Sequence, residues 1–378
     1  MSKVLVSEHG IVCRLPGERF SYFGWPTIAR LDDGMLIVAS SGLRSEHVCP
    51  WGKTVLNTSS DDGRTWSAPR VINDSPLDDR DAGIVNLGGR RVLVSWFTTA
   101  NHSYAQEKWV REWLGDDEVD SWLPTLDAIT PEISAQGLAS WIMLSNDRGE
   151  TWSAPIRAPV SSPHGPVLLR SGDLFYIGKS YMSGLSDMEV GAINTARSRD
   201  GGLTWERQGS VPIHPGTDFA NYHEPHVVEL PGGRLVAMIR VEDHKDHPLA
   251  PAGVVNFSVM QTESDDGGAT WAPARPMGFH GSPPHLIRHS SGVLVMTYGY
   301  RQAAFGQRVA FSHDDGITWD HDWIIRDDGP DGDLGYPSTV ELGDGSLLTV
   351  CYQKVADDRK CSLLWSRWRM GQGSGDRD

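Results

Sequence analysis

Five copies of one eight-residue pattern, S-x-D-x-G-x-T-W, constrain the fold of this chain more than any other feature. The copies are SSDDGRTW (59–66), SNDRGETW (145–152), SRDGGLTW (198–205), SDDGGATW (264–271) and SHDDGITW (312–319). In each copy the Asp can accept backbone N–H bonds of a tight turn, the Gly can adopt a positive φ, and the Trp can pack as an apolar plug between neighbouring sheets. We therefore interpret the octet as a structural turn, because five catalytic carboxylates would be spread around the rim of the molecule.

A second unit recurs between the octets: an apolar strand, a tight glycine turn and another apolar strand. Six copies align on the turn glycines Gly34, Gly89, Gly172, Gly233, Gly292 and Gly345. Each copy predicts a β-hairpin, and the first five copies continue into a third strand, the octet and a fourth strand. Four strands in this order are typical of a propeller blade. We expect an all-β fold, a six-bladed β-propeller of four-stranded blades.

The last unit lacks an octet. Its third strand is predicted in CSLLWSRW (361–368), and the N-terminal VLVSEHGIVCRL (4–15) is placed to add the missing outer strand and close the ring. We expect one propeller domain over residues 1–370 and a flexible tail over 371–378. Residues 99–137 interrupt blade two with a partly helical insertion, which could cover the channel mouth or mediate self-association.

Charge and composition argue against several classes of function. The 378 residues carry a net charge of −15, so we expect no nucleic-acid partner and no anionic membrane partner. No stretch approaches the ~20 apolar residues of a membrane span and no secretion signal is visible, so we expect a cytoplasmic protein. We expect no cofactor, and free thiols without metal-ligand spacing at Cys13, Cys49, Cys351 and Cys361.

Propeller geometry predicts where a site lies, because the inner strands of all blades start at one channel mouth. At the position nine residues before each turn glycine, or one residue later, the chain carries Trp25, Arg80, Asp81, His164, Glu224 and Tyr336. The second strands return to this mouth with Arg44, Lys179, Arg240 and Arg301. Together with the flanking His223 and His285, these residues predict a polar pocket on the axis.

Two further features of this region concern charge and metals. Arg240 and Arg301, at equivalent positions of neighbouring blades in an acidic protein, favour anion binding. His223 and His226 do not favour a metal, since a strand places residues i and i+3 on opposite faces. The acidic stretch 327–335 could bind calcium, but it is more typical of a solvated loop.

The octet is the Asp-box, or BNR repeat, and five copies on a six-unit β pattern resemble the sialidase (neuraminidase) superfamily over essentially the whole chain. The resemblance extends to EPHVVELPGGRLVAMIR (224–240), to the Arg of YGYR and to the Tyr of GYPSTVEL. It implies Tyr336 as nucleophile, Glu224 as its base, and a clamp of Arg240 and Arg301 on a substrate carboxylate. A phenol needs such a base because its pKa is near 10.

Two stretches depart from the pattern of that superfamily. Gly24-Trp25-Pro26 stands where the family has Arg-Ile-Pro, and Glu46 and His47 stand where it has its Asp acid/base. One forked arginine contact, worth about 1.5–3 kcal/mol, is missing. Arg80 or Arg44 could replace that arginine, or the substrate could be another acidic sugar. Asp81 or His47 could replace the proton donor.

Three functions are compatible with these residues. The favoured hypothesis is a sialidase-like exo-glycosidase that acts on a carbohydrate with an acidic sugar through a covalent, retaining mechanism. In a polysaccharide lyase, the alternative, an Arg would neutralise a uronate while Tyr or His removes the C5 proton. A sugar-binding propeller without catalysis is the third. We favour an enzyme because a Tyr beside a Glu in a charged ring exceeds what binding requires.

Overall fold

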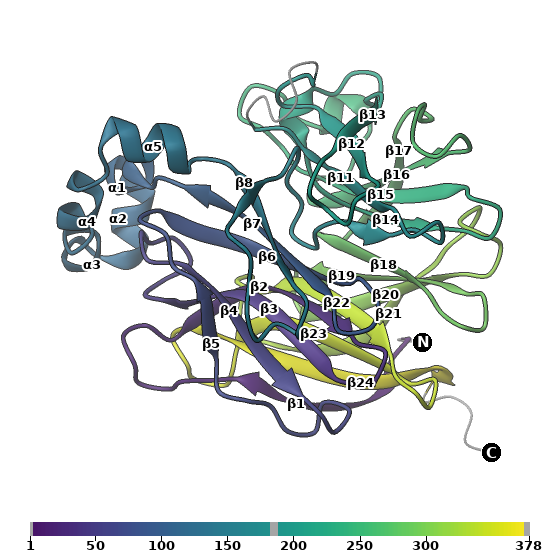
Figure 1. Cartoon of the computed structure of the whole chain (residues 1–378), viewed down its shortest axis with the longest axis horizontal. Helices are drawn as coiled ribbons and strands as arrows, with labels where there is room; N and C mark the ends of the chain where they lie inside the picture. Colours follow the sequence, from purple (N-terminus) through teal and green to yellow (C-terminus); the bar gives the residue numbers. More distant parts are fainter. Residues whose placement is uncertain (1–2, 182–187, 374–378) are drawn as a thin grey trace.

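The computed structural model describes residues 3–181 and 188–373, and its strands form six four-stranded antiparallel sheets. Figure 1 shows these sheets as the blades of one propeller, with the helices gathered in a lobe to one side. The predicted six-bladed β-propeller is therefore confirmed. Each inner hairpin joins consecutive strands through the predicted glycine turn. The alternating apolar residues of these strands face the neighbouring blades.

The blades contain the following strands. Blade one consists of β2 (Tyr22–Arg30), β3 (Leu36–Arg44), β4 (Lys53–Ser59) and β5 (Arg70–Asn73). Blade two consists of β6 (Asp78–Asn86), β7 (Val92–Thr99), β8 (Ser140–Ser145) and β9 (Ile156–Arg157). Blade three consists of β10 (Val167–Leu168), β11 (Leu174–Lys179), β12 (Ile193–Ser198) and β13 (Glu206–Ser210).

The second half of the chain repeats this order. Blade four consists of β14 (Tyr222–Glu229), β15 (Leu235–Val241), β16 (Ser258–Ser264) and β17 (Arg275–His280). Blade five consists of β18 (Pro284–Arg288), β19 (Leu294–Tyr300), β20 (Phe305–Ser312) and β21 (Asp320–Gly329). Blade six consists of β22 (Gly335–Glu341), β23 (Leu347–Lys354), β24 (Cys361–Gly373) and β1 (Leu5–Cys13).

The first strand closes the ring, as predicted. β1 pairs antiparallel with β24, with His9 opposite Ser366 and Ile11 opposite Leu364. This pairing makes the N-terminal segment the outer strand of the last blade and removes an exposed strand edge. The tail prediction for 371–378 needs a correction at its start, because β24 runs to Gly373 and its pairing with Leu5 includes that residue. Residues 374–378 lie outside the described residues.

The octets form the predicted turns. In the first box Ser59 Oγ accepts from Gly63 N at 3.0 Å, Asp61 Oδ1 accepts from Thr65 N at 2.9 Å, and Gly63 has a φ of +82°. Hydrogen bonds from Thr65 lower the pKa of Asp61 to about 2. In the fifth box the Trp319 indole donates to Gln261 at 2.8 Å, and Gln261 in turn donates to the Gly316 carbonyl at 2.8 Å.

The tryptophans of the octets pack between blades. Trp66 contacts a cluster that includes Val38 of blade one and Leu348 of blade six, and the other four octet tryptophans pack in the same way against the preceding blade. Blade six has no octet, and Trp368 of β24 takes this place: it is buried with Phe311 and Val295 of blade five. The sixth interface thus keeps its tryptophan although the motif is missing.

The insertion of blade two is helical, as predicted. Its helices are α1 (His102–Gln106), α2 (Lys108–Leu114), α3 (Asp116–Asp120), α4 (Leu123–Asp127) and α5 (Pro131–Gly137). Two short 3-10 helices, η1 (Phe219–Asn221) and η2 (Ala250–Ala252), lie in blade four. The core of the insertion, in which Val110, Val119 and Trp122 are buried, also includes Val48 and Cys49 of the loop that follows β3. Among the described residues no helix is long and apolar enough to cross a membrane.

The octet serine is expected to stabilise the fold. We predict that Ser264→Ala lowers the free energy of unfolding by about 1–3 kcal/mol, because Gly268 N–H then loses its acceptor in a buried turn. Urea unfolding followed by tryptophan fluorescence measures this change. The matched control is Ser171→Ala in an exposed hairpin turn, where we expect a change within about 0.5 kcal/mol. Equal effects of both substitutions would contradict a stabilising role for the octet.

Candidate active site

Four residues start their inner strands in the same unusual conformation. Trp25, Asp81, Glu224 and Tyr336 have φ values of +54°, +53°, +48° and +50°. Each lies at an irregularity in the pairing of its inner hairpin. A bulge of this kind re-aims a side chain, and positive φ outside glycine is costly and concentrates at functional sites. All four side chains line one pocket of about 220 Å³.

The structure changes the predicted alignment in blade two. Counting nine residues back from Gly89 points to Arg80, but Asp81 is the residue in the left-handed conformation. The turn of blade two closes with a bond from Arg91 N to Gly88 O, whereas the other hairpins bond the turn glycine itself, as Gly34 N does to Leu31 O. Arg90, and not Gly89, therefore occupies the position of the turn glycine in blade two, which shifts the count by one residue. Arg80 and Asp81 nevertheless both line the pocket.

The centre of the pocket is a cluster of Tyr336, Glu224 and Arg240. The Tyr336 hydroxyl donates to Glu224 Oε1 at 2.5 Å. Arg240 Nη1 donates to Glu224 Oε2 at 2.6 Å and to the Tyr336 oxygen at 3.0 Å, while Nη2 donates to Glu242 at 2.5 Å. Glu224 and Arg240 both belong to blade four, whereas Tyr336 of blade six lies 112 and 96 positions from them in the chain. The ring of blades brings a phenol, its acceptor and a guanidinium into direct contact.

Burial and these contacts shift the pKa values in opposite directions. Burial raises the pKa of Tyr336 well above 10, and the Glu224 carboxylate adds to this effect. Burial also opposes ionisation of Glu224, but Arg240 and the Tyr336 hydroxyl outweigh it and hold the pKa of Glu224 below its usual value. The phenol is therefore neutral and the carboxylate ionised. This is the starting state of a nucleophile with a base beside it.

Asp81 is the carboxyl of the pocket that keeps a proton. Burial raises the pKa of Asp81 to about 7, although Arg80 lowers it. The side chain is 7% exposed, and its Oδ1 is buried without a hydrogen-bond partner. A buried, protonated carboxyl with an unpaired oxygen in a pocket is suited to donate a proton to a bound molecule.

Two arginines offer free donors to the pocket. Arg80 lies over the Trp25 ring at 4.2 Å, and the Nη1 contacts that bind it, to the His47 carbonyl and Asp78, are long at 3.3 and 3.4 Å. Arg301 is held by its Nε, which donates to the Leu334 carbonyl at 3.0 Å. Among the residues that the structure describes, the Nη2 of Arg80 and both Nη atoms of Arg301 have no hydrogen-bond partner and can reach a ligand. Arg80 of blade two thus lies beside Trp25 of blade one, the blade that lacks the expected arginine.

His47 also lines the pocket, and Asp333 and Tyr22 orient it. Its Nδ1 lies 2.9 Å from Asp333 Oδ1 and 2.8 Å from the Tyr22 hydroxyl, which itself donates to Asp333 at 2.9 Å. Because Asp333 accepts from both partners, the Nε2 of neutral His47 carries the lone pair. Burial lowers the pKa of His47 below 6.5. The charges of Arg80 and Arg44 lower it further, while Asp333 raises it.

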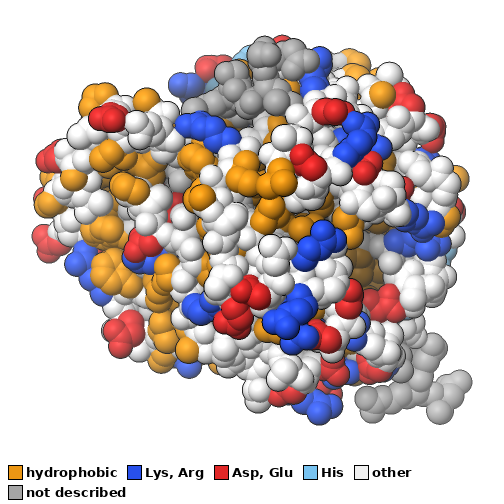
Figure 2. Space-filling view, viewed as in Figure 1, with side chains coloured by type: hydrophobic (Ala, Val, Ile, Leu, Met, Phe, Trp, Pro, Cys, Tyr) orange, Lys and Arg blue, Asp and Glu red, His pale blue; other side chains and the backbone are white. Residues whose placement is uncertain are grey.

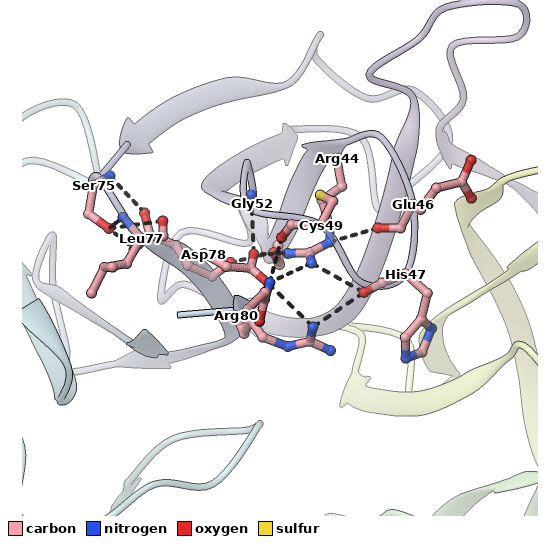
Figure 3. Close-up of polar contacts among 12 residues, drawn as sticks. Arg44, Glu46, His47, Cys49, Gly52, Ser75, Leu77, Asp78 and Arg80 are labelled. Carbon is pink, nitrogen blue, oxygen red and sulfur yellow. Dashed lines mark hydrogen bonds and ion pairs between the residues drawn. The ribbon is translucent and has the colours of Figure 1, made fainter. Parts of the chain in front are cut away.

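The structure corrects the placement of Arg44, predicted to bind substrate. Its side chain is fully buried, and it donates to Asp78 at 2.5 and 2.8 Å, to Ser41 at 2.9 Å and to the carbonyls of Glu46 and His47 at 3.2 Å (Figure 3). No donor remains for a ligand. In β3 it is Ser41 that pairs with Gly24 beside Trp25, so Arg44 lies three residues beyond the pocket. Arg44 positions the His47 loop instead.

Three histidine placements also need correction. His164 and His285, predicted to bind substrate, are buried in the channel with His226, and their ring centroids are 4.4–5.4 Å apart. Backbone N–H groups of Leu286 and Thr339 donate to the Nδ1 atoms of His226 and His285. The pair His164 and His285 therefore packs the channel and does not reach the pocket wall. His223 lies beside Glu242, 3.7 Å away, outside the pocket lining.

The acidic stretch 327–335 is engaged by two cations and a histidine of the chain itself. Asp328 pairs with Arg326 at 2.7 Å, Asp331 pairs with Lys354 at 2.6 Å, and Asp333 binds His47. Within residues 3–181 and 188–373 no group of three or more His, Cys, Asp or Glu side chains is arranged to hold a metal ion. The four cysteines are free and buried.

Comparison with known proteins agrees with this geometry. A family model described as a BNR repeat-like domain matches residues 128–349, more than half of the chain. The chain belongs to this family. This BNR repeat-like chain is 28% identical to the xyloglucanase Xgh74A of Acetivibrio thermocellus over 193 residues, which is 48% of the chain and 20% of the relative. It is 26% identical to a sialidase of Micromonospora viridifaciens over 165 residues, 37% of the chain and 25% of the relative.

Solved structures share the fold. A protein of unknown function from Dyadobacter fermentans superposes with a TM-score of 0.73 at 19% identity, covering 96% of this chain and 98% of that one. The NanB sialidase of Streptococcus pneumoniae gives 0.65 at 14% identity, covering 97% and 71%. The architecture is that of a sialidase-like BNR propeller. The chain spans about a fifth to a quarter of the length of the two curated relatives.

Several pocket residues of this BNR propeller were missed from sequence. Phe97 pairs with Arg80 as Arg240 pairs with His223, so the hairpin register applied to every blade would have found it. Thr99 at the end of β7 and Tyr181 just after the end of β11 could have been found in the same way, because these second strands end at the pocket. Asp333, which does not line the pocket but orients His47, lay in a stretch interpreted as a solvated loop. Tyr104, which comes from the insertion, had no register to place it.

Arg44 provides a test of structure against ligand binding. We predict that Arg44→Met lowers the free energy of unfolding by about 3–5 kcal/mol, because it leaves the buried Asp78 carboxylate unpaired. Chemical denaturation measures this loss. Arg14→Met, which breaks the partly exposed pair with Asp358, is the control and is expected to cost clearly less. A stable Arg44→Met protein that loses only ligand affinity would return Arg44 to the group of substrate-binding residues.

Proposed function

We propose that this chain is a sialidase-like exo-glycosidase that removes a terminal acidic sugar with retention of configuration. The observation that carries the proposal is the 2.5 Å hydrogen bond from Tyr336 to Glu224 inside a pocket lined by three arginines. The membership in the BNR repeat-like family and the similarity to a sialidase and a xyloglucanase support a glycosidase.

The reaction has two steps. In the first, the Tyr336 oxygen attacks the anomeric carbon as its proton passes to Glu224, and the bond to the leaving group breaks while Asp81 protonates the leaving oxygen. In the second, water attacks the same carbon, its proton passes to Asp81, and the Tyr336 oxygen departs and recovers its proton from Glu224. Tyr336, Glu224 and Asp81 all return to their starting states, and the configuration is inverted twice.

The charge of the pocket favours a carboxylate in the substrate. Arg80, Arg240 and Arg301 face Glu224 and Glu242, while Asp81 is protonated below pH 7, so one positive charge remains in a protein of net charge −15. Arg240 is already bound to two carboxylates. Arg80 and Arg301 are therefore the clamp on the substrate carboxylate, and Arg80 replaces the arginine missing at Gly24-Trp25-Pro26. A neutral tyrosine nucleophile suits such a substrate, since a carboxylate nucleophile would be repelled by it.

The nucleophile and its base can be tested by substitution. We expect Tyr336→Phe to lower kcat by at least ~10³-fold and Glu224→Gln by ~10²–10⁴-fold, because the first removes the attacking oxygen and the second its proton acceptor. The assay uses 4-nitrophenyl glycosides of sialic and uronic acids together with uronate oligosaccharides. Tyr300→Phe, a partly buried tyrosine under Arg308, is the control and is expected to keep full activity.

Three readouts separate the outcomes of this assay. A glycosyl fluoride of the cleaved sugar, fluorinated also on the ring, should leave a covalent adduct on Tyr336 detectable by mass spectrometry. Hydrolysis that survives both substitutions would exclude Tyr336 as nucleophile. A product that absorbs in the near ultraviolet, typical of an unsaturated uronate, would assign the pocket to a lyase. Sugar binding without turnover of any panel member would indicate a sugar-binding propeller that has no catalytic activity.

Asp81 predicts the pH dependence of the reaction. Its pKa of about 7 leaves it protonated below that pH, so kcat/KM of the wild type should fall as pH rises through about 7. Asp81→Asn should remove this alkaline limb and lower kcat/KM by ~10²–10⁴-fold on an alkyl glycoside, but far less on a 4-nitrophenyl glycoside, whose leaving group needs no proton. Equal losses on both substrates would exclude Asp81 as the donor and favour His47.

A further inference from the structure

The helical insertion presents an aromatic face that its own core does not use. Helix α2 buries Val110 against Val119 and Trp122, yet Trp109 and Trp113 on the same helix are 49% and 47% exposed. Two half-exposed tryptophans one turn apart are an unusual surface for a protein in water, and exposed apolar patches mark binding sites. Figure 2 shows hydrophobic side chains gathered on the lobe that carries this insertion, at the left of the view.

These rings are continuous with the pocket. Trp109 and Trp113 stack with centroids 6.1 Å apart and planes at 20°. Tyr104 meets Trp109 edge-on at 6.2 Å, and His47 lies 6.0 Å from Trp113. Tyr104 and His47 both line the pocket. We call Tyr104, Trp109 and Trp113 the aromatic strip; it begins at the pocket wall and leads outward over α1 and α2.

The charged groups around the strip leave no basic side chain of α2 free. Lys108 pairs with Glu112 at 2.9 Å, and Arg111 pairs with Asp116 and Asp120 of α3 at 3.0 and 2.9 Å. These two cations and three carboxylates carry one negative charge in excess. Such a surface disfavours an anionic ligand and favours a flat, uncharged one, because an anion would meet like charge and would be desolvated without a cationic partner.

We propose that the aromatic strip is a subsite for the uncharged sugar rings on the leaving-group side of the substrate. The inference rests on the proposed function and adds the substrate class: a glycan in which neutral pyranoses carry the terminal acidic sugar. A pocket of about 220 Å³ holds little more than one sugar ring. The next ring must leave through the mouth, where the C–H face of a neutral pyranose can lie flat on an indole.

The first experiment measures binding without turnover. In the Glu224→Gln protein, lactose and cellobiose are titrated while tryptophan fluorescence and heat are recorded. We expect a saturable change that is lost in Trp109→Ala and Trp113→Ala, and retained in Trp113→Tyr, which keeps a ring. Leu123→Ala, a 40% exposed apolar residue on α4 of the same insertion, is the matched control. No saturable change, or one that persists in both alanine variants, overturns the proposal.

The second experiment uses two substrates with the same acidic sugar. For a glycan with a lactose leaving group, Trp113→Ala should lower kcat/KM by about 3- to 10-fold, while the methyl glycoside should change less than about 2-fold. Equal losses on both would contradict the subsite. If no acidic glycoside is cleaved but the disaccharides still bind, the proposed function fails and the strip stands. A wild-type dimer in sedimentation velocity that dissociates in Trp109→Ala would assign the strip to self-association and overturn the subsite.

Discussion

The pairing of β1 with β24 is the constraint on which the rest of the structure depends. It joins Leu5–Cys13 to the last blade and so fixes blade six against blade one. The two blades share a core in which Trp25 and Tyr336 are buried together with Phe23 and Leu348. Because the ring is closed, residues that start inner strands far apart in the chain face one axis. Closure also sets blade one, with Trp25, beside the Tyr336 of blade six.

The pocket combines two kinds of arginine. Arg44 uses all five of its N–H groups on protein acceptors and holds the His47 loop, whereas Arg240 holds the Tyr336–Glu224 pair through Nη1 and Glu242 through Nη2. Arg80 and Arg301 are held through one side of the guanidinium and keep donors free. The same side chain therefore serves positioning or ligand binding according to how many of its five N–H groups the protein already uses.

Proton chemistry in the pocket follows from the partners of each buried group rather than from residue type. Two carboxyl groups start equivalent strands in equivalent conformations, yet Glu224 is ionised beside Arg240 and Asp81 keeps its proton to about pH 7. Environments that push two acids apart in this way supply a base and an acid in one site. His47, which stands where an acidic residue was expected, is held neutral by burial and is oriented by Asp333.

The sequence by itself determined the blades. Octets and glycine turns are local devices whose hydrogen bonds form within a few residues, so spacing alone predicted six hairpins, five turn motifs, the closing strand and the helical insertion. It also placed Tyr336, Glu224, Asp81, Arg240, Arg301 and Arg80 at one mouth, because hairpin register repeats from blade to blade.

Only the tertiary structure decided which side chains have donors left for a ligand. Arg44, His164 and His285 share the favoured residue types and approximate positions, but a buried partner in another blade uses them first. Such contacts join residues tens to hundreds of positions apart, and no local pattern records them. Asp333 and the aromatic strip depend in the same way on how loops fold back over the mouth, which spacing along the chain does not determine.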